Sequence, residues 1–230
     1  MAKLRDMVQE GRHLIVGAIG TSAGLDVDPA ADPCDIIELR LDLLGTGQGV
    51  AEYCRLHGPK APILLTARHP EEGGGGEMSS EERSAALRGL LDHAAAIDIE
   101  LRSLEEMETV WTEAGERGLV RIASYHNFDD APPPEKLTPF ILPAAEAGAD
   151  LVKFAVRITE PGDLHTISAL LRLGAPLPLA VMGMGPLGPS SRVLAMQLGS
   201  VLNYGYLGDE PTAPGQWPVS LLREVRERLI

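Results

Sequence analysis

Cysteine is scarce in this chain, which carries only Cys34 and Cys54 among its 230 residues. Two thiols in a chain of this length supply neither a disulfide framework nor the repeated spacing of a cysteine-ligated metal site. The sequence therefore predicts reduced thiols and a cytoplasmic protein.

Basic residues are in deficit, because 20 lysines and arginines face 33 aspartates and glutamates and give a net charge of -13. A protein that binds the phosphate backbone needs a basic surface, so we expect no nucleic-acid partner. Long apolar runs are missing too. The stretch Leu14–Ile19 is too short to span a membrane and lacks a following cleavage signature, so we expect no membrane partner. A small-molecule enzyme fits these limits.

Short apolar runs alternate with helical patterns along the whole chain, which is the signature of a parallel sheet built from β/α units. The predicted strands are Leu14–Ile19, Ile36–Leu41, Ile63–Ala67, Ile97–Leu101, Val120–Tyr125, Leu151–Val156, Leu177–Met182 and Val201–Tyr206. Eight such units predict an α/β fold, a (β/α)8 TIM barrel that forms a single catalytic domain over residues 1–230.

Cap and turn signals predict helices over residues 80–95, 104–117, 138–147 and 219–229. Ser79–Glu82 has the spacing of a capping box, and Gly118 and Gly148 are suited to end two of the helices. Four consecutive glycines, Gly73–Gly76, predict a flexible loop.

Polar side chains recur at every second position of several predicted strands, and residues two apart share one face of a strand. The sets that share a face are Glu38, Arg40 and Asp42; Thr66 and Arg68; Asp98, Glu100 and Arg102; and Ser124 and His126. In a barrel the apolar face meets the helices, so these side chains should point into the lumen, where active sites form at the C-terminal strand ends. A half-exposed antiparallel edge would explain any one strand equally well, whereas recurrence favours the lumen.

Lys153 is the one ammonium in the segment Asp150–Val156, which otherwise suits a fully buried strand. Burial disfavours the charged form and lowers the pKa, and a neutral amine can attack a carbonyl carbon to form a Schiff base. The alternative is a lysine at a strand edge, with its stem packed on apolar neighbours and its head in water.

Several motifs follow one another in a characteristic order. They are Glu38-Leu39-Arg40-Leu41-Asp42, Thr66-Ala67-Arg68 with Glu72-Gly73-Gly74, Asp98-Ile99-Glu100, Ser124-Tyr125-His126-Asn127-Phe128, Ala149-Asp150-Leu151-Val152-Lys153, Met182-Gly183-Met184-Gly185 with Ser191-Arg192, and Ala213-Pro214-Gly215-Gln216. Over nearly its whole length the chain thereby resembles the type I 3-dehydroquinate dehydratases of the shikimate pathway. The resemblance implies a barrel that dehydrates 3-dehydroquinate to 3-dehydroshikimate through a lysine imine, as a homodimer without metal or bound cofactor.

The resemblance also implies catalytic and binding roles for individual residues. Lys153 matches the imine-forming residue, His126 the general acid/base, and Glu72 a carboxylate that orients or polarises the histidine. The positions that match substrate-binding residues are Glu38, Arg40, Arg68, Arg192, Thr212 and Gln216. Thr212 and Gln216 lie in Pro211–Trp217, which matches a closing loop.

Each of these residues has a simpler interpretation when taken alone. His126 would be a structural hydrogen-bonding residue and Glu72 an ordinary loop carboxylate. The charged lumen would be an ion-pair network that holds the barrel, although that role is compatible with substrate binding. Pro211–Trp217 would be a surface turn.

Three positions depart from the family pattern. Thr212 stands where many relatives have serine and retains the hydroxyl, and Leu39 replaces an aromatic residue that faces the helices. Arg157 stands where an apolar residue is common, and close approach to Lys153 would lower the pKa of that amine further.

Other functions remain open from the sequence. Lysine imines also occur in barrel aldolases, and a barrel could bind a sugar acid without turnover. A divalent-metal enzyme would use as ligands Glu38, Asp98, Glu100 and His126. Against it, Arg40, Arg68 and Lys153 bring positive charge into the same lumen.

Overall fold

The structure is a computed structural model, and it describes residues 2–229. Its strands are β1 Leu14–Ile19, β2 Ile36–Arg40, β3 Ile63–Thr66, β4 Ala96–Glu100, β5 Val120–Asn127, β6 Leu151–Arg157, β7 Leu179–Met184, β8 Leu202–Tyr206 and β9 Trp217–Pro218. Its α-helices are α1 Ala2–Gln9, α2 Leu41–Leu44, α3 Gln48–His57, α4 Ser80–Arg88, α5 Glu108–Glu116, α6 Pro134–Leu137, α7 Ile141–Glu146, α8 Leu164–Leu171, α9 Gly188–Gln197 and α10 Val219–Leu229. Short 3-10 turns are η1 Ala23–Asp26, η2 Pro70–Glu72, η3 Leu91–His93, η4 Leu101–Ser103, η5 Thr138–Phe140 and η6 Pro161–Asp163.

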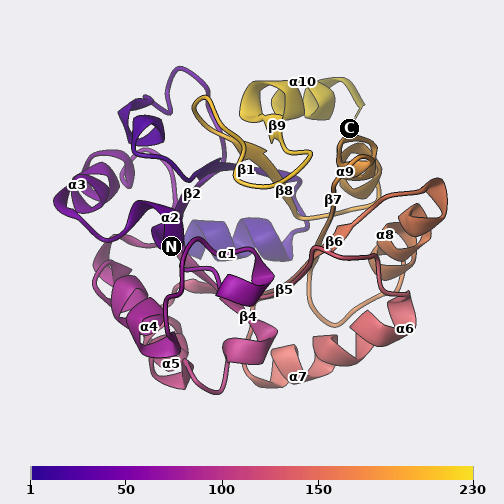
Figure 1. The fold of residues 1–230 in the computed structure, drawn as a ribbon, viewed down its shortest axis with the longest axis horizontal. Helices are drawn as coiled ribbons and strands as arrows, with labels where there is room; N and C mark the ends of the chain where they lie inside the picture. Colours follow the sequence, from indigo (N-terminus) through magenta and orange to yellow (C-terminus); the bar gives the residue numbers. More distant parts are fainter. Residues whose placement is uncertain (1, 230) are drawn as a thin grey trace.

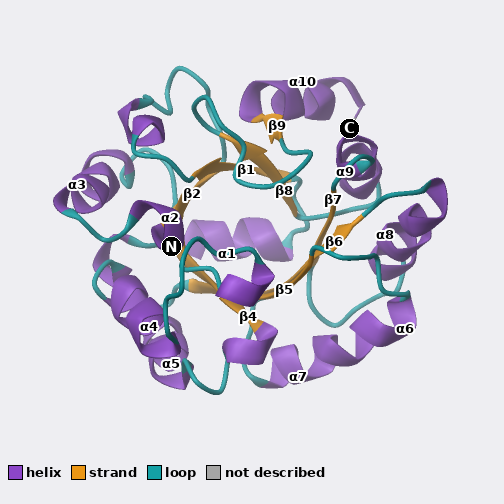
Figure 2. Cartoon of the chain, in the orientation of Figure 1, coloured by secondary structure: helices purple, strands orange, loops and turns teal. Residues whose placement is uncertain are grey.

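The strands curl into a ring with helices around its outside (Figures 1 and 2). Hydrogen-bonded neighbours follow the order β7-β6-β5-β4-β3-β2-β1-β8-β9, and every pairing is parallel. Parallel neighbours need crossover connections, and the helices that provide them cover the outer face of the sheet. The predicted (β/α)8 barrel is confirmed.

The ring has a seam between β7 and β8. Within residues 2–229 no strand ladder joins these two strands, although the backbone N–H of Val201 donates to the carbonyl of Leu179 at 3.0 Å. The Ser200 hydroxyl lies across the same gap, 3.0 Å from the N of Val181 and 3.2 Å from its carbonyl oxygen. Near the other end of β8, the short strand β9 pairs with Gly205 and Tyr206. Arg192 of α9 reaches β8 beside this seam, where its Nη1 donates to the Tyr204 carbonyl at 2.8 Å.

Two apolar layers surround the strands. The outer layer fills the space between strands and helices, with Ile37, Leu39 and Phe154 among its members. The inner layer fills the N-terminal half of the lumen, where Val16 and Leu64 pack with Leu4 of α1. Helix α1 crosses behind the ring in Figure 1. The lumen is thus closed at one end by apolar side chains, and its polar side chains lie toward the C-terminal end.

Strand positions follow the prediction within one or two residues. β2 ends at Arg40 because the chain turns directly into α2, while β5 runs on to Asn127 and β7 ends at Met184. β9 is too short to give a sequence signal. None of the helices within residues 2–229 is long and apolar enough to cross a membrane.

Helix ends were predicted less well. The helix expected to reach Ala95 ends at Arg88, because the chain continues as a 3-10 turn over Leu91–His93. The helix expected from residue 104 starts at Glu108, and residues 138–140 form a 3-10 turn ahead of α7. Gly118 and Gly148 follow their helices with φ of 74° and 80°, values at which a side chain would be strained. The last helix is as predicted.

Candidate active site

Lys153 lies in the middle of β6 with its side chain in the lumen, and the residue is 4% exposed. Its Nζ donates to Asp98 Oδ2 at 2.8 Å and lies 4.3 Å from the centroid of the Tyr204 ring. Burial lowers the pKa of the amine, and the neighbouring carboxylate of Asp98 opposes that shift. The structure therefore buries this amine, as the sequence predicted, instead of leaving it at a strand edge.

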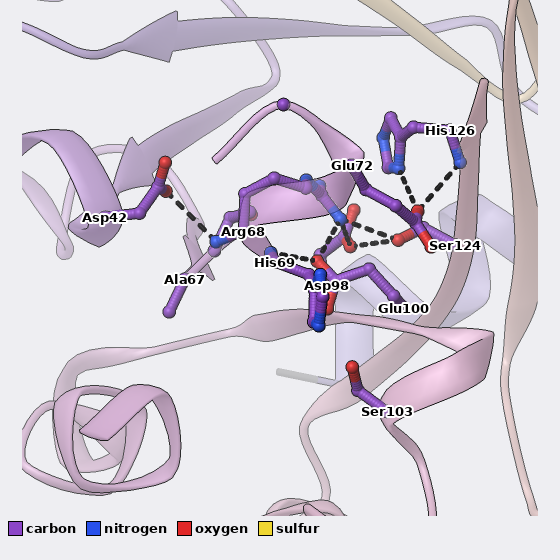
Figure 3. Close-up of polar contacts among 12 residues, drawn as sticks. Asp42, Ala67, Arg68, His69, Glu72, Asp98, Glu100, Ser103, Ser124 and His126 are labelled. Carbon is purple, nitrogen blue, oxygen red and sulfur yellow. Dashed lines mark hydrogen bonds and ion pairs between the residues drawn. The ribbon is translucent and has the colours of Figure 1, made fainter. Parts of the chain in front are cut away.

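Arg68 is the centre of a buried polar cluster (Figure 3), and Asp98 connects this cluster to Lys153. Its Nη1 donates to Asp98 Oδ1 at 2.8 Å, to Glu100 Oε1 at 2.7 Å and to Ser124 Oγ at 2.8 Å. The Ser124 hydroxyl in turn donates to Asp98 Oδ1 at 2.6 Å. Burial alone would raise the pKa of Asp98, but Arg68 and Lys153 outweigh it and hold that pKa well below its ordinary value. Asp98 is thus a fixed negative charge between the two cations.

Arg83, which the sequence did not single out, completes this cluster from outside the strands. It lies on α4, is fully buried, and donates from Nη1 to Glu100 Oε2 at 2.6 Å. Its Nη2 donates to Ser103 Oγ at 2.9 Å. Glu100 therefore bridges two guanidinium groups, one on each of its oxygens.

His126 and Glu72 form a second buried pair at the C-terminal end of β5. Glu72 Oε2 accepts from the backbone N–H of His126 at 2.8 Å and lies 3.0 Å from its Nδ1 (Figure 3). Burial raises the pKa of Glu72 to about 7, with Glu100 adding to the shift. Burial also lowers the pKa of His126 well below its ordinary value, helped by Arg68 and Lys153. A neutral imidazole with its Nδ1–H on Glu72 leaves Nε2 free as a base.

Arg40 is the last residue of β2, and its side chain is held by Asp42, which lies in α2. Its Nε and Nη2 donate to the two carboxylate oxygens of Asp42 at 2.9 and 2.6 Å. Asp42 also accepts from the backbone N–H of Arg68 at 3.1 Å and of Gly75 at 2.9 Å. Arg40 reaches the same glycine loop through the carbonyl of Gly73 at 3.0 Å. The loop predicted to be flexible is therefore fixed at two of its four glycines.

Glu38 and Thr66 lie next to one another on β2 and β3. Both are buried, and the Thr66 hydroxyl donates to Glu38 Oε1 at 2.8 Å. Glu38 lines the same pocket as Lys153 and Arg192. It is thereby available to a hydroxyl group of a ligand in that pocket.

Arg192 enters the lumen from α9, on the side of the seam. The residue is 3% exposed, and its Nη1 donates to the backbone carbonyl of Tyr204 at 2.8 Å. Desolvation lowers the pKa of Arg192 to about 10, because no carboxylate offsets the cost of burial. Within residues 2–229 no acidic side chain forms an ion pair with it, and its Nε has no hydrogen-bond partner. A buried guanidinium without a carboxylate partner is suited to bind an anionic ligand.

Thr212 and Gln216 bind to each other at the pocket's mouth. Both the backbone N–H and the hydroxyl of Thr212 donate to Gln216 Oε1, at 2.7 and 3.0 Å. The loop that carries them ends at Trp217, where β9 joins β8. The Gln216 amide oxygen is thereby fixed, which leaves its amide nitrogen as a donor for a ligand.

One pocket collects the side chains that the sequence assigned to the site. All nine line it: Glu38, Arg40, Arg68, Glu72, His126, Lys153, Arg192, Thr212 and Gln216. A wider cleft lies beyond the barrel wall and shares Glu72 and His126, but Lys153 and the three arginines do not line it. The inner pocket is therefore the candidate active site.

Comparison with known proteins identifies the family of this chain. The family model of the type I 3-dehydroquinases matches residues 22–229. The chain is 34% identical over 226 residues to the 3-dehydroquinate dehydratase of Methanothrix thermoacetophila, an alignment that covers 94% of this chain and 93% of the relative. The chain belongs to the type I 3-dehydroquinase family.

Solved structures of 3-dehydroquinate dehydratases share the fold of this type I 3-dehydroquinase. The Geobacillus kaustophilus protein superposes with a TM-score of 0.84 at 24% identity, covering 95% of this chain and 91% of that one. The Clostridium difficile enzyme, solved with covalently modified comenic acid, gives a TM-score of 0.81 at 26% identity over 96% of this chain and 94% of that one. The predicted family and fold are thus confirmed together.

Arg102 lies away from the lumen, contrary to the prediction, and the structure also places Arg157, whose position the sequence left open. Arg102, expected to face the lumen with Asp98, lies in η4 and pairs with Glu71 at 2.6 Å on the surface. The alternation fails there because the strand ends at Glu100. Arg157 is exposed, and its Nη1 donates to the Phe128 carbonyl at 3.2 Å.

The metal interpretation finds no ligand set in this type I 3-dehydroquinase. Among residues 2–229 no group of three or more histidine, cysteine, aspartate or glutamate side chains is arranged to hold an ion. Asp98 and Glu100 instead bind guanidinium and ammonium groups, which occupy the oxygens that a cation would need.

Proposed function

We propose that this chain dehydrates 3-dehydroquinate to 3-dehydroshikimate in the shikimate pathway, through a covalent imine on Lys153. The observation that carries the proposal is the buried amine of Lys153, which lines one pocket with an uncompensated guanidinium and a histidine base. A keto acid needs these three groups: an amine for the ketone, a cation for the carboxylate and a base for the proton between them.

The three arginines of the pocket have different partners, and this difference orients the substrate. Arg68 is bonded to Asp98 and Glu100, and Arg40 to Asp42. Arg192 has a backbone carbonyl as its partner. A substrate carboxylate gains most where the cation is uncompensated, so we assign it to Arg192. Glu38, Arg40 and Arg68 then face the ring hydroxyls, while Gln216 and Thr212 close the pocket's mouth.

The ketone of the substrate meets the amine of Lys153. The ammonium first gives up one proton, and the neutral amine attacks the carbonyl carbon. The carbonyl oxygen then leaves as water with that proton and one of the two remaining N–H protons, and the nitrogen keeps the last hydrogen as a cationic iminium. Desolvation lowers the amine's pKa and so favours the attacking form. The Clostridium difficile relative, with its covalently modified ligand, supports covalent chemistry in this fold.

Proton transfer falls to His126. The iminium accepts the electron pair released when Nε2 of the imidazole removes the neighbouring proton, which gives a neutral enamine. Return of that pair expels the β-hydroxyl, which leaves as water with a proton from His126. Glu72 holds the imidazole through Nδ1, at 3.0 Å, and so keeps Nε2 directed at the pocket. Hydrolysis of the iminium then frees the enone product and restores Lys153.

Three further properties implied by the resemblance are part of this proposal. We propose that the chain acts as one catalytic domain, as a homodimer and in the cytoplasm. The parallel barrel supports the first, because its strands are paired from one end of the chain to the other. Sedimentation analysis of the purified protein would test the dimer, and cell fractionation would test the location.

The experiment that tests the function is borohydride reduction during turnover. Adding 3-dehydroquinate should produce the absorbance of the conjugated enone, and borohydride should inactivate the enzyme and add the reduced ligand to Lys153. Lys153→Ala should remain folded, produce no enone and take up no label. A label on Lys60 or Lys136, or carbon–carbon cleavage in place of enone formation, would contradict the proposal.

His126→Ala separates proton transfer from imine formation. General acid/base catalysis contributes about 10²–10⁴-fold, so turnover should fall at least that far while borohydride still labels Lys153. Turnover within a few-fold of the parent would show that another group moves the proton.

A further inference from the structure

Tyr204 is a buried residue of the pocket to which the proposed reaction gives no role. It lies on β8, is 4% exposed, and its ring centroid is 4.3 Å from Lys153 Nζ. Its hydroxyl has no hydrogen-bond partner among residues 2–229. The contact that the structure does give this side chain is the one between its ring face and the amine of Lys153.

The charged and titratable groups around Lys153 come from five elements and one loop. They are Glu38 of β2, Arg68 just after β3, Asp98 of β4, His126 of β5, Tyr204 of β8 and Arg192 of α9. Of these, Asp98 is the hydrogen-bond partner of the amine, and it is shared with Arg68 and Ser124. The amine's charge is therefore only partly balanced by its carboxylate, and the ring face lies against the same atom.

We propose that Tyr204 is a catalytic residue whose ring face stabilises the iminium formed between Lys153 and the substrate. In the free enzyme the same ring face stabilises the ammonium and so opposes part of the effect of burial on the amine. The inference rests on the imine function proposed for Lys153. Electron density on the face of an aromatic ring attracts a cation within about 6 Å of its centroid, and does so more strongly when water is excluded.

The ring can interact with Lys153 both before and after imine formation, because the nitrogen is positively charged both as the ammonium and as the iminium. An ammonium and a ketone give an iminium and one water: the carbonyl oxygen leaves with two of the three N–H protons, and the positive charge remains on the new C=N bond. Hydrogen bonds from the nitrogen are lost with those two protons. The interaction with the ring needs the charge and no N–H, so it persists from resting enzyme to covalent intermediate.

Fluorinated phenylalanines at position 204 test this without changing the fold. Tyr204→Phe removes the unpartnered hydroxyl and keeps the ring, and successive fluorines withdraw electron density from a ring of nearly the same shape. The pKa of Lys153 would be followed by NMR of the lysine side chains. The chain has four lysines, so Lys3, Lys60 and Lys136 serve as internal references.

We expect the pKa of Lys153 to fall with each added fluorine, by about 0.4–1.5 pH units in total, and the reference lysines to remain unchanged. With substrate at a pH above that pKa, the borohydride-trapped iminium should fall by about 2- to 30-fold across the series. A pKa and a trapped fraction that do not respond to fluorine number, or that rise with it, would overturn the proposal.

Tyr204→Leu extends the series to a side chain without an aromatic ring. It should lower the pKa of Lys153 and the trapped fraction at least as far as the most fluorinated ring, and equality with Tyr204→Phe would again count against the proposal. If this variant does not fold, the fluorinated series decides alone. Failure of the proposed reaction is distinguishable, because a substrate adduct away from Lys153 would leave the effect of the ring on the free amine measurable.

Discussion

The two sides of the pocket carry positive charge in opposite ways. Around Asp98 and Glu100 of β4, three cations each have a carboxylate within 2.8 Å: Arg68, Arg83 and Lys153. On the side of the seam, Arg192 is as deeply buried and has a backbone carbonyl in place of a carboxylate.

The paired cations therefore contribute to the stability of the fold, whereas the unpaired cation is suited to ligand binding. Removing one member of a buried ion-pair cluster leaves its partners charged and uncompensated, so the cluster constrains the fold. Burying a guanidinium without a carboxylate lowers the stability of the free protein, and binding of an anion offsets this cost. The two arginines, Arg68 and Arg192, should therefore respond in opposite ways to the same kind of substitution.

The largest expected effect is on stability, in Arg68→Ala. Loss of this guanidinium leaves Asp98 and Glu100 with too little positive charge, which should lower the free energy of unfolding by about 3–5 kcal/mol. Urea denaturation of the purified variant would measure it. Arg88→Ala is the control, because Arg88 pairs with Glu113 while 53% exposed, and such pairs contribute about 0–1 kcal/mol. Equal losses in the two variants would remove the stabilising role given to the cluster.

The next effect is on binding, in Arg192→Met, where the methionine fills the space of the arginine stem. Affinity for 3-dehydroquinate should weaken by about 2–5 kcal/mol, because the substrate carboxylate loses its partner. Calorimetry on a Lys153→Ala background would measure it without turnover. The free energy of unfolding should stay unchanged or increase, since a buried uncompensated charge is gone. If Arg192→Met lost as much stability as Arg68→Ala, Arg192 would also stabilise the fold, and the two arginines would not differ in role.

A smaller effect is expected from pH, through Glu72. Its pKa in the folded protein is about 7, above the ordinary 4.5, so between these values the folded state holds a proton that the unfolded state has lost. Stability should therefore fall as the pH rises through this window, by roughly 3 kcal/mol at most. Urea denaturation of the parent and Glu72→Gln at about pH 5 and about pH 8 would show it. The difference in stability between the two proteins should shift against the parent at the higher pH. A difference that is independent of pH would mean that Glu72 is already ionised across the window.

The smallest effect is expected at the pocket's mouth. Gln216→Ala removes a neutral hydrogen bond to the ligand and the acceptor for Thr212, so substrate affinity should fall by about 0.5–1.5 kcal/mol. Calorimetry on the Lys153→Ala background, as for Arg192→Met, places the two losses on one scale. An effect as large as that of Arg192→Met would move the principal carboxylate contact from Arg192 to the loop.

Most residues that line the candidate pocket could be predicted from the sequence, because strand periodicity and the order of the motifs are properties of the linear chain. Residues two apart on a strand, such as Asp98 and Glu100, must share a face, and the barrel then brings the faces together. Asp42 and Arg102 show where this reasoning stops. Each lies just past a strand end, where the backbone turns helical and the alternation no longer applies.

Arg83 and Tyr204 could not be predicted, for a different reason. Arg83 lies on a helix whose other charged residues face solvent, and its burial depends on how α4 packs over the end of β3. The position of the Tyr204 ring under Lys153 depends on the curvature that brings β8 opposite β6. Such contacts arise from three-dimensional packing, and no periodicity in the sequence marks them.

The seam between β7 and β8 gives the ring a preferred place to open. A barrel with continuous ladders distributes thermal motion around its circumference, whereas here local opening should begin where Val201 and Ser200 join the two edges. In the proposed reaction, a substrate covalent to Lys153 on β6 and bound by Arg192 on α9 would connect two elements beside this opening. Local opening at the seam should then be rarest while the covalent intermediate is present and should return when the product leaves.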